Sequence, residues 1–431
     1  MFATLKNAWH IAELRQKICF TLMIIVLFRL GAGVPVPFLD PAALQNMVSG
    51  AGNLLGYLDI LSGGAFANAT IFALSITPYI TSSIVIQLLT VAIPALERMA
   101  KEGEDGRKKI QKITRYTTIG LALLQAFAYY TMLKNQQGAV KYTTGWEGIF
   151  VAFVIVATFT AGAMLIVYLG ERIDERGIGN GISLILFAGI VSRGPAAVRS
   201  FWGYLKLNEF AFTAIVLELV MIAVFILLIA AIIVMTNAER RIPVQYAKKV
   251  VGRKMYGGQS TFIPIKVNMS GVMPIIFASS LLAIPGTIGA FVHPAADSFW
   301  GKFLSAFHYN TLLYAALYFV LIIAFNYFYV AIQYNPIEMS NNLRNNSGTI
   351  PGIRPGRPTS DFIARIISKI TLIGGIVIAL VAVLPIIIGS FTELNVSLGG
   401  TSIIIVVGVA LDTFRQLESQ MMMRHYKGFL E

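Results

Sequence analysis

Charged residues inside apolar stretches are the first candidates for chemistry in this sequence. Arg29 and Glu218 lie within long apolar runs, and Asp412 lies near the end of another. Ionisable groups at membrane depth are candidate functional sites because burying a charge there is costly. Two simpler interpretations stay open: Arg29 is close enough to the end of its run to reach the interface, and Glu218 can make a structural hydrogen bond. The three residues form no recognisable proton relay.

The residue types that bind metals or phosphates lack the required spacing. The histidines fall at the termini or in a predicted external loop: His10, His293, His308 and His425. A single cysteine, Cys19, excludes an intramolecular disulfide and a cysteine metal cluster. The glycines of 177–181 follow an apolar helix and not a strand, which argues against a phosphate loop, and no Walker lysine motif is present. The sequence predicts no metal, no cofactor and no catalytic residue, so energy from ATP would come from a partner.

The elements that position these residues are apolar segments long enough to cross a bilayer. Hydrophobic residues make up 56% of the chain and charged residues 13%, with a mean hydropathy of +0.71. A soluble globule needs more polar surface than this, and about 20 apolar residues span the hydrocarbon core. We expect an all-α polytopic membrane protein with ten spans, over 18–34, 71–93, 114–133, 149–169, 181–198, 211–236, 270–290, 311–332, 370–389 and 401–414.

Positive charges set the orientation of these spans. Lys and Arg concentrate at both ends of the chain and in the loops after spans two, four, six and eight. Cytoplasmic segments carry such an excess, so both termini are expected in the cytoplasm. The fifth span is short, but if it failed to cross, every later loop would change sides against the charge pattern. A cleaved signal peptide is less favoured, because Val34-Pro35-Val36-Pro37 is not a cleavage pattern.

The spans divide the chain into two predicted halves, 1–200 and 201–431, with five spans each. An odd number of spans per half gives inverted halves if the two are related. The cytoplasmic loops 237–269 and 333–369 are long, basic and punctuated by Gly and Pro. They either anchor the topology or, as favoured here, form a docking surface, and the first indicates a structured turn or hairpin.

One external segment, 54–69, is apolar, interrupted by glycines and free of Lys and Arg. Its length is about half the membrane thickness. Irregular backbone at membrane depth survives only when it is buried in protein or lines a watery cavity. A re-entrant half-helix inside the bundle is therefore expected, with a helix at the membrane surface as the alternative.

Several motifs, in order along the chain, resemble those of the SecY family. They are Ser62-Gly63-Gly64-Ala65, 71–80 with 86–89, 101–107, 175–181, 266–269, 351–356 and 399–402. The resemblance covers essentially the whole chain. It implies a ten-helix clamshell, spans one to five against six to ten, around an hourglass pore in the bacterial inner membrane. It also implies a protein-conducting channel that passes unfolded secretory polypeptides and releases transmembrane segments sideways into lipid.

The resemblance assigns expected roles to particular residues. The pore constriction would be lined by six apolar side chains, called the ring residues below: Ile76, Ile80, Ile182, Leu186, Ile276 and Ile405. A plug at about 57–67 would stop the resting pore from outside, and its residues would be Tyr57, Leu58, Ile60, Leu61, Ser62, Gly63, Gly64 and Phe66. Gln87 and Asn268 are candidates for bridging a lateral gate, between spans two and three on one side and seven and eight on the other.

The same resemblance implies partners. SecE and SecG would complete a heterotrimer, substrates would carry signal sequences, and membrane lipids would surround the complex. A SecA ATPase or the translating ribosome would dock on basic residues of the two long loops: Arg240, Arg241, Lys248, Lys249, Arg253, Lys254, Arg344, Arg354 and Arg357. Arg354 is the strongest single candidate because a Pro/Gly turn holds it.

The residue chemistry fits a channel independently of the resemblance. Ile76 with Ile80, and Ile182 with Leu186, are i, i+4 pairs, so each pair faces one side of its helix. An apolar ring can exclude ions by dewetting and still offer a passing peptide no strong binding site. Ordinary helix packing explains each residue alone better, and only the resemblance singles out the set. An ion-coupled transporter would need polar ligands near the midplane, and a membrane transferase an acidic cluster; the sequence favours neither.

Overall fold

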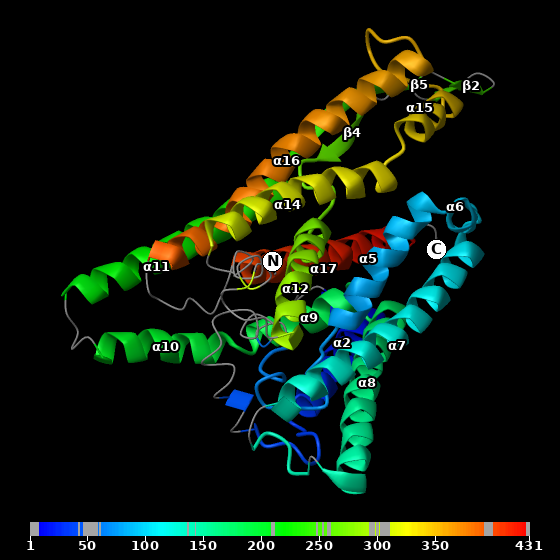
Figure 1. Cartoon of the computed structure of the whole chain (residues 1–431). Helices are drawn as coiled ribbons and strands as arrows, with labels where there is room; N and C mark the ends of the chain where they lie inside the picture. The colour runs from blue at the N-terminus through cyan, green and yellow to red at the C-terminus, as the bar shows by residue number, and fades with distance from the viewer. Residues whose placement is uncertain are drawn as a thin grey trace.

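The computed structural model describes residues 8–41, 44–45, 59, 62–135, 138–142, 144–207, 212–246, 249–251, 254–256, 260–292, 298, 301, 311–391 and 400–427. In this part of the chain most elements are long helices, and the few short strands lie together at one end (Figure 1). The predicted helical membrane class is confirmed.

The first half forms one set of packed helices. They are α2 (Ala12–Gly31), α5 (Thr77–Ala92), α6 (Pro94–Lys101), α7 (Glu104–Asn135), α8 (Gly145–Arg176), α9 (Gly181–Val191) and α10 (Gly194–Leu207). α7 packs against α5 and α8, and α8 also contacts α2 and α9. Ala122 and Ala126 of α7 are buried in the same core as Ile155 and Phe159 of α8. Small residues on α7 let helices approach closely, which favours association in a bilayer.

The second half follows the same packing rule with longer helices. They are α11 (Phe212–Asn237), α12 (Met273–Val292), α14 (Leu312–Gln333), α15 (Pro336–Asn345), α16 (Arg357–Phe391) and α17 (Gly400–Lys427). α14 lies along α16 and also packs against α12, while α11 contacts α16 and α17 (Figure 1). The two halves meet where α12 packs on α5 and α7, and where α17 packs on α9.

The strands join the two long basic loops. β1 (Glu239–Tyr246) pairs antiparallel with β4 (Ser260–Lys266), and a hairpin of β2 (Lys249–Val251) and β3 (Lys254–Tyr256) lies between them in sequence. This confirms the predicted hairpin in loop 237–269. β5 (Gly348–Thr349) of the other loop pairs with β1, where Gln245 is opposite Thr349. The loops therefore form one three-stranded sheet in the order β4-β1-β5.

Some helix boundaries differ from the predicted spans. The second span was expected from residue 71, but 71–76 form turns, Ser75 has φ +50°, and the helix begins at Thr77. The fifth span was expected over 181–198, but α9 ends at Val191 and α10 begins at Gly194. At this break the Ser192 hydroxyl donates to the Gly189 carbonyl oxygen at 2.6 Å and completes the last turn of α9.

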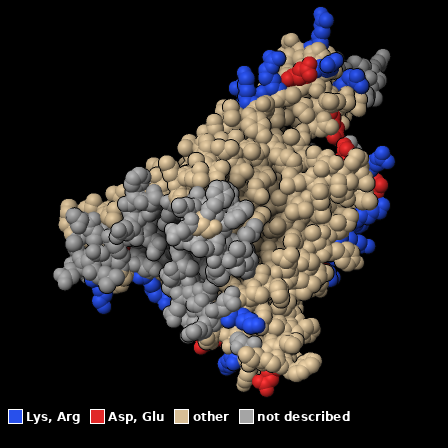
Figure 2. Space-filling model, in the orientation of Figure 1, with Lys and Arg blue, Asp and Glu red and all other residues tan. Residues whose placement is uncertain are grey.

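Length and apolar composition identify four membrane-spanning candidates among the described helices: Gly145–Arg176, Ile215–Asn237, Leu312–Asn345 and Arg357–Ile387. α5 and α6 together pass the same test but bend by 105° at Ile93. This residue has extended backbone because it precedes Pro94. The predicted total of ten spans stays a prediction. Lys and Arg gather at the end of the molecule that carries α15 and α6, and a broad surface largely free of charge separates them from the Lys and Arg on the opposite side (Figure 2).

Candidate pore constriction and its seal

Helices from both halves bring the ring residues into one apolar cluster. Four ring residues are buried members of the cluster, and two pack against it: Ile76, Leu186, Ile276 and Ile405, with Ile80 and Ile182. The buried four are between 0% and 9% exposed. Six positions spread over the whole sequence therefore meet at the contact between the halves. An enclosed apolar cluster of this kind contains no side chain that could bind one particular polypeptide sequence.

Helix α9 is positioned by polar contacts at its start. Asn180 caps the helix, since its side-chain oxygen accepts the Ser183 N–H at 3.0 Å. Asp174 of α8 accepts the Gly181 N–H at 2.7 Å. A Cβ at Gly181 would overlap the Gly170 carbonyl group, so glycine is what allows α9 to begin directly against α8. These contacts fix the orientation of α9, which carries Ile182 and Leu186.

A buried polar cluster positions α12 on the opposite side. Ser270, just before α12, donates to the Asn326 side-chain oxygen of α14, and the Asn326 amide donates to the Thr371 carbonyl oxygen of α16 at 2.8 Å. All three residues are buried. Hydrogen bonds at this depth are costly to break because no water replaces them. They tie the start of α12, and therefore Ile276, to α14 and α16.

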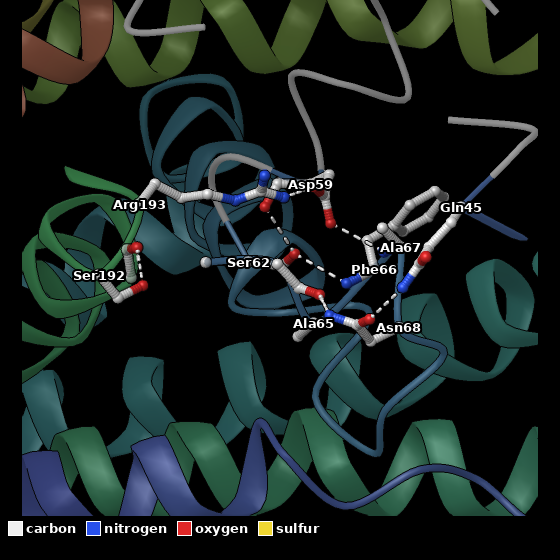
Figure 3. Close-up of polar contacts among 12 residues, drawn as sticks. Gln45, Asp59, Ser62, Ala65, Phe66, Ala67, Asn68, Ser192 and Arg193 are labelled. Atoms are coloured by element: carbon white, nitrogen blue, oxygen red, sulfur yellow. Dashed lines mark hydrogen bonds and ion pairs between the residues drawn. The ribbon is translucent and has the colours of Figure 1, made fainter. Parts of the chain in front are cut away.

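Beside the ring, residues 62–69 form a run of turns, called the turn segment below (Figure 3). Ser62 donates to the Asp59 carbonyl oxygen, and the Phe66 N–H donates to the Ser62 hydroxyl at 3.0 Å. The Tyr129 hydroxyl of α7 donates to the Phe66 carbonyl oxygen at 3.1 Å. Ala65 is fully buried in the same cluster as the ring residues. The turn segment is thus packed against the constriction.

The turn segment contains part of the predicted plug. Ser62, Gly63, Gly64 and Phe66 lie in it, and most of the segment is buried in the protein, although Asn68 is exposed. The other four predicted plug residues lie outside the described residues: Tyr57, Leu58, Ile60 and Leu61. The described run of the expected plug, 62–67, lies beside the ring, and it forms turns instead of the expected half-helix.

The two predicted gate residues have different surroundings. The Gln87 amide donates to Ser83 on its own helix at 3.3 Å, so its described contact is local. The side-chain oxygen of Asn268 is buried and has no partner among the described residues. Asn268 lines a cavity of about 370 Å³, together with Ile276, Asn180 and Asp412. Asn268 therefore lines the space next to the constriction, whereas the hydrogen bond of Gln87 lies within α5.

The predicted docking residues that the structure describes are exposed on one surface, called the platform below, which is formed by β1, α15 and the turn before α16. Arg240 and Arg241 are on β1, Arg344 is near the end of α15, and Arg354 and Arg357 border the turn before α16. Gly352 and Gly356 have φ values of +81° and +100°, which supports the predicted Pro/Gly turn at Arg354. Lys248 and Arg253 lie outside the described residues, and Lys249 and Lys254 are described by backbone only, in β2 and β3.

The sequence analysis did not identify the ionic contacts of the turn segment. Asp59 forms an ion pair with Arg193, and Arg29 donates to the Gly63 carbonyl oxygen at 3.0 Å. The sequence leaves a functional role and an interfacial or packing role open for Arg29, and the structure shows its side chain bound to the backbone of the turn segment. The Oε1 atom of Glu218 has no hydrogen-bond partner among the described residues, which does not support the expected structural hydrogen bond. The third intramembrane candidate, Asp412, forms an ion pair on its own helix, with its Oδ1 atom 3.9 Å from Nη1 of Arg415.

A model of the SecY family matches residues 70–414. The chain belongs to the SecY family. The protein translocase subunit SecY of Mycobacterium tuberculosis (strain ATCC 25618 / H37Rv) is 42% identical over 449 residues, and the match covers 100% of both chains. The SecY family member of Thermus thermophilus, also described as a protein translocase subunit, is 43% identical over 429 residues, which cover 98% of this chain and 96% of the relative.

Solved structures with the SecY family fold are also similar. One, described as the structure of a protein conducting channel, superimposes with a TM-score of 0.67 and covers 94% of this chain and 92% of that chain at 18% identity. Sec61 in the canine ribosome-channel complex gives a TM-score of 0.63 with the same coverage and identity. At this identity the likeness shows the shared fold.

Proposed function

We propose that this protein is the protein-conducting channel of a bacterial translocase. The observation that carries the proposal is the convergence of the ring residues, from both halves, into one apolar cluster with the turn segment packed against it. Full-length relatives described as protein translocase subunits support it. The two halves, 1–200 and 201–431, would move apart to open the pore, and the turn segment would leave the constriction.

The mechanism follows from the chemistry of the ring. Closed, an apolar constriction excludes water and hydrated ions without a polar gate. Open, it lets an extended polypeptide slide because no ring side chain can hydrogen-bond to it. A sufficiently apolar segment gains about 0.3–0.6 kcal/mol per Leu, Ile, Phe or Val on entering lipid. The exit path would pass between α5 and α7 on one side and α12 and α14 on the other, with Asn268 beside it.

The energy for transport would come from partners. The exposed arginines of the platform suit a SecA ATPase or a ribosome, and ribosomal RNA would contact them mainly through phosphate charge. SecE and SecG would accompany the chain in the bacterial inner membrane, with both termini in the cytoplasm. Secretory and membrane proteins with signal sequences would be the substrates.

The deciding experiment crosslinks an arrested secretory chain to single cysteines. Ile80→Cys, Leu186→Cys and Ile276→Cys are introduced one at a time with Cys19→Ser, since Cys19 is exposed. Leu219→Cys, on the outward side of α11 and 63% exposed, is the matched control. We expect crosslinks from all three ring positions and none from Leu219. An arrested chain that reaches Leu219 but no ring position would contradict the proposal.

A further inference from the structure

A buried carboxylate is the central feature of the contacts next to the turn segment. Asp59 is 3% exposed. One of its carboxylate oxygens accepts the Ala67 N–H at 2.7 Å, and the other pairs with the Arg193 guanidinium (Figure 3). Its carbonyl oxygen accepts from Ser62 and from the Gly64 N–H. A carboxylate can be buried in this way only with such partners, because an unpaired buried charge is strongly disfavoured.

The cations of this cluster come from separate elements. Arg193 lies in the break between α9 and α10, and Arg29 reaches from α2 to the Gly63 carbonyl oxygen at 3.0 Å. A Cβ at Gly64 would lie 3.6 Å from the Arg193 guanidinium, so both cations lie against neighbouring residues of the turn segment. Asp59 therefore supplies the negative charge that lets both cations approach the same short segment.

Close packing ties the same segment to the helix that carries two ring residues. A Cβ at Gly63 would lie 2.9 Å from both the Cα and the carbonyl oxygen of Gly189 in α9. The φ of Gly63 is +67°, so a larger residue would be unfavourable in both space and backbone. Displacing the turn segment therefore also removes a packing surface from the end of α9.

We propose that the Asp59–Arg193 ion pair, together with the Arg29 contact to Gly63, is a latch that holds the turn segment against α9 and sets how readily the pore opens. The inference rests on the proposed function and adds residues to it. Arg29 and Arg193 are positioning residues: they act on the constriction through the turn segment. Moving the segment away separates Asp59 from Arg193 and leaves two like charges without their counter-ion, so the closed arrangement is stabilised by the complete set.

The test removes the charges one at a time without changing side-chain shape more than necessary. Asp59→Asn, Arg193→Gln and their combination are compared in planar bilayers, where the ionic current of the resting channel is measured without any substrate. Each single variant is expected to raise the current about tenfold, because a charged hydrogen bond contributes on that order to the closed state. The double variant should leak no more than the leakier single variant, since paired residues are not additive.

Matched variants show whether a raised current comes from loss of the latch or from general misfolding of the channel. Arg199→Gln removes an exposed cation of α10 and should leave the current unchanged. Arg193→Lys keeps the charge and should leak less than Arg193→Gln. Resting currents of purified Asp59→Asn and Arg193→Gln protein that equal the wild-type current would overturn the latch, as would fully additive effects in the double variant.

A second readout distinguishes this inference from the proposed function. Export of a reporter with a defective signal is measured in cells that carry each variant, beside a reporter with an intact signal. The latch predicts that Asp59→Asn and Arg193→Gln raise export of the defective reporter about tenfold. If the intact reporter is exported while neither variant changes export of the defective one, only the latch is wrong. If wild-type protein exports neither reporter, the proposed function is wrong, and the resting currents still decide the latch.

Discussion

Replacing Ile405 by asparagine perturbs the constriction where the structure allows the size of the effect to be worked out. Ile405 is 2% exposed and lies in the ring cluster. Removing its buried side chain costs the closed state about 2 kcal/mol, and burying an amide without a partner costs about 1–3 kcal/mol more. In an open, wet pore the asparagine is hydrated and the isoleucine is not buried, so most of this cost falls on the closed state.

A shift of about 3 kcal/mol changes the ratio of open to closed channels about a hundredfold, since 1.4 kcal/mol is a factor of ten. Ile405→Asn should therefore conduct ions at rest and export a reporter whose signal is defective, and Ile276→Asn should do the same. Ile405→Leu keeps the volume and apolar character and is the matched control. Normal signal stringency and normal resting current in both asparagine variants, at wild-type amounts in the membrane, would refute the reasoning.

Three further predictions concern the platform and the helix packing. Arg354→Glu should abolish SecA-driven translocation into vesicles while the purified channel unfolds at the wild-type temperature; normal ATP-driven transport would contradict the docking role. The logarithm of the ribosome affinity should fall linearly with the logarithm of the salt concentration, and Arg354→Gln should reduce the magnitude of this slope by about one. An unchanged slope would show that Arg354 does not contact the ribosome. Gly162→Ala would place a Cβ against the Ile71 carbonyl oxygen, so it should lower the free energy of unfolding in detergent by about 1–3 kcal/mol. Gly120→Ala is the matched control, because Gly120 has open space around it and the free energy of unfolding should not fall. Equal effects of the two variants would contradict the packing argument.

Local patterns in the sequence predicted the helices well. The hydropathy runs predicted α11 and α14 closely, because a buried or lipid-facing helix is apolar all round. The ninth span was expected over 370–389, but α16 already begins at Arg357, in a polar stretch that hydropathy does not mark as a span. The i, i+4 spacing of Ile182 and Leu186 and the charge and glycine pattern of loop 237–269 are also local, and the structure has the expected helix face and hairpin. The assignment of the ring as a pore depended on the resemblance to the SecY family.

Contacts between distant segments could not be predicted in this way. Asp59 and Arg193 are far apart in sequence and share no periodicity, so nothing local marks them as partners. The same holds for β5, whose two residues become a strand only by pairing with β1. The break after α9 is visible in the sequence as a short apolar run followed by Arg193 and Pro195, but a hydropathy average over 181–198 extends the span across this turn.

The sheet of the platform has a mechanical consequence. β1 follows α11 directly, β4 leads into α12, and β5 lies between α15 and α16, so one ladder grips the ends of three membrane helices. If a partner binds the exposed arginines as proposed, a displacement of the sheet would be transmitted along α12, the helix that carries Ile276. The partner could then act on the constriction without entering the bilayer.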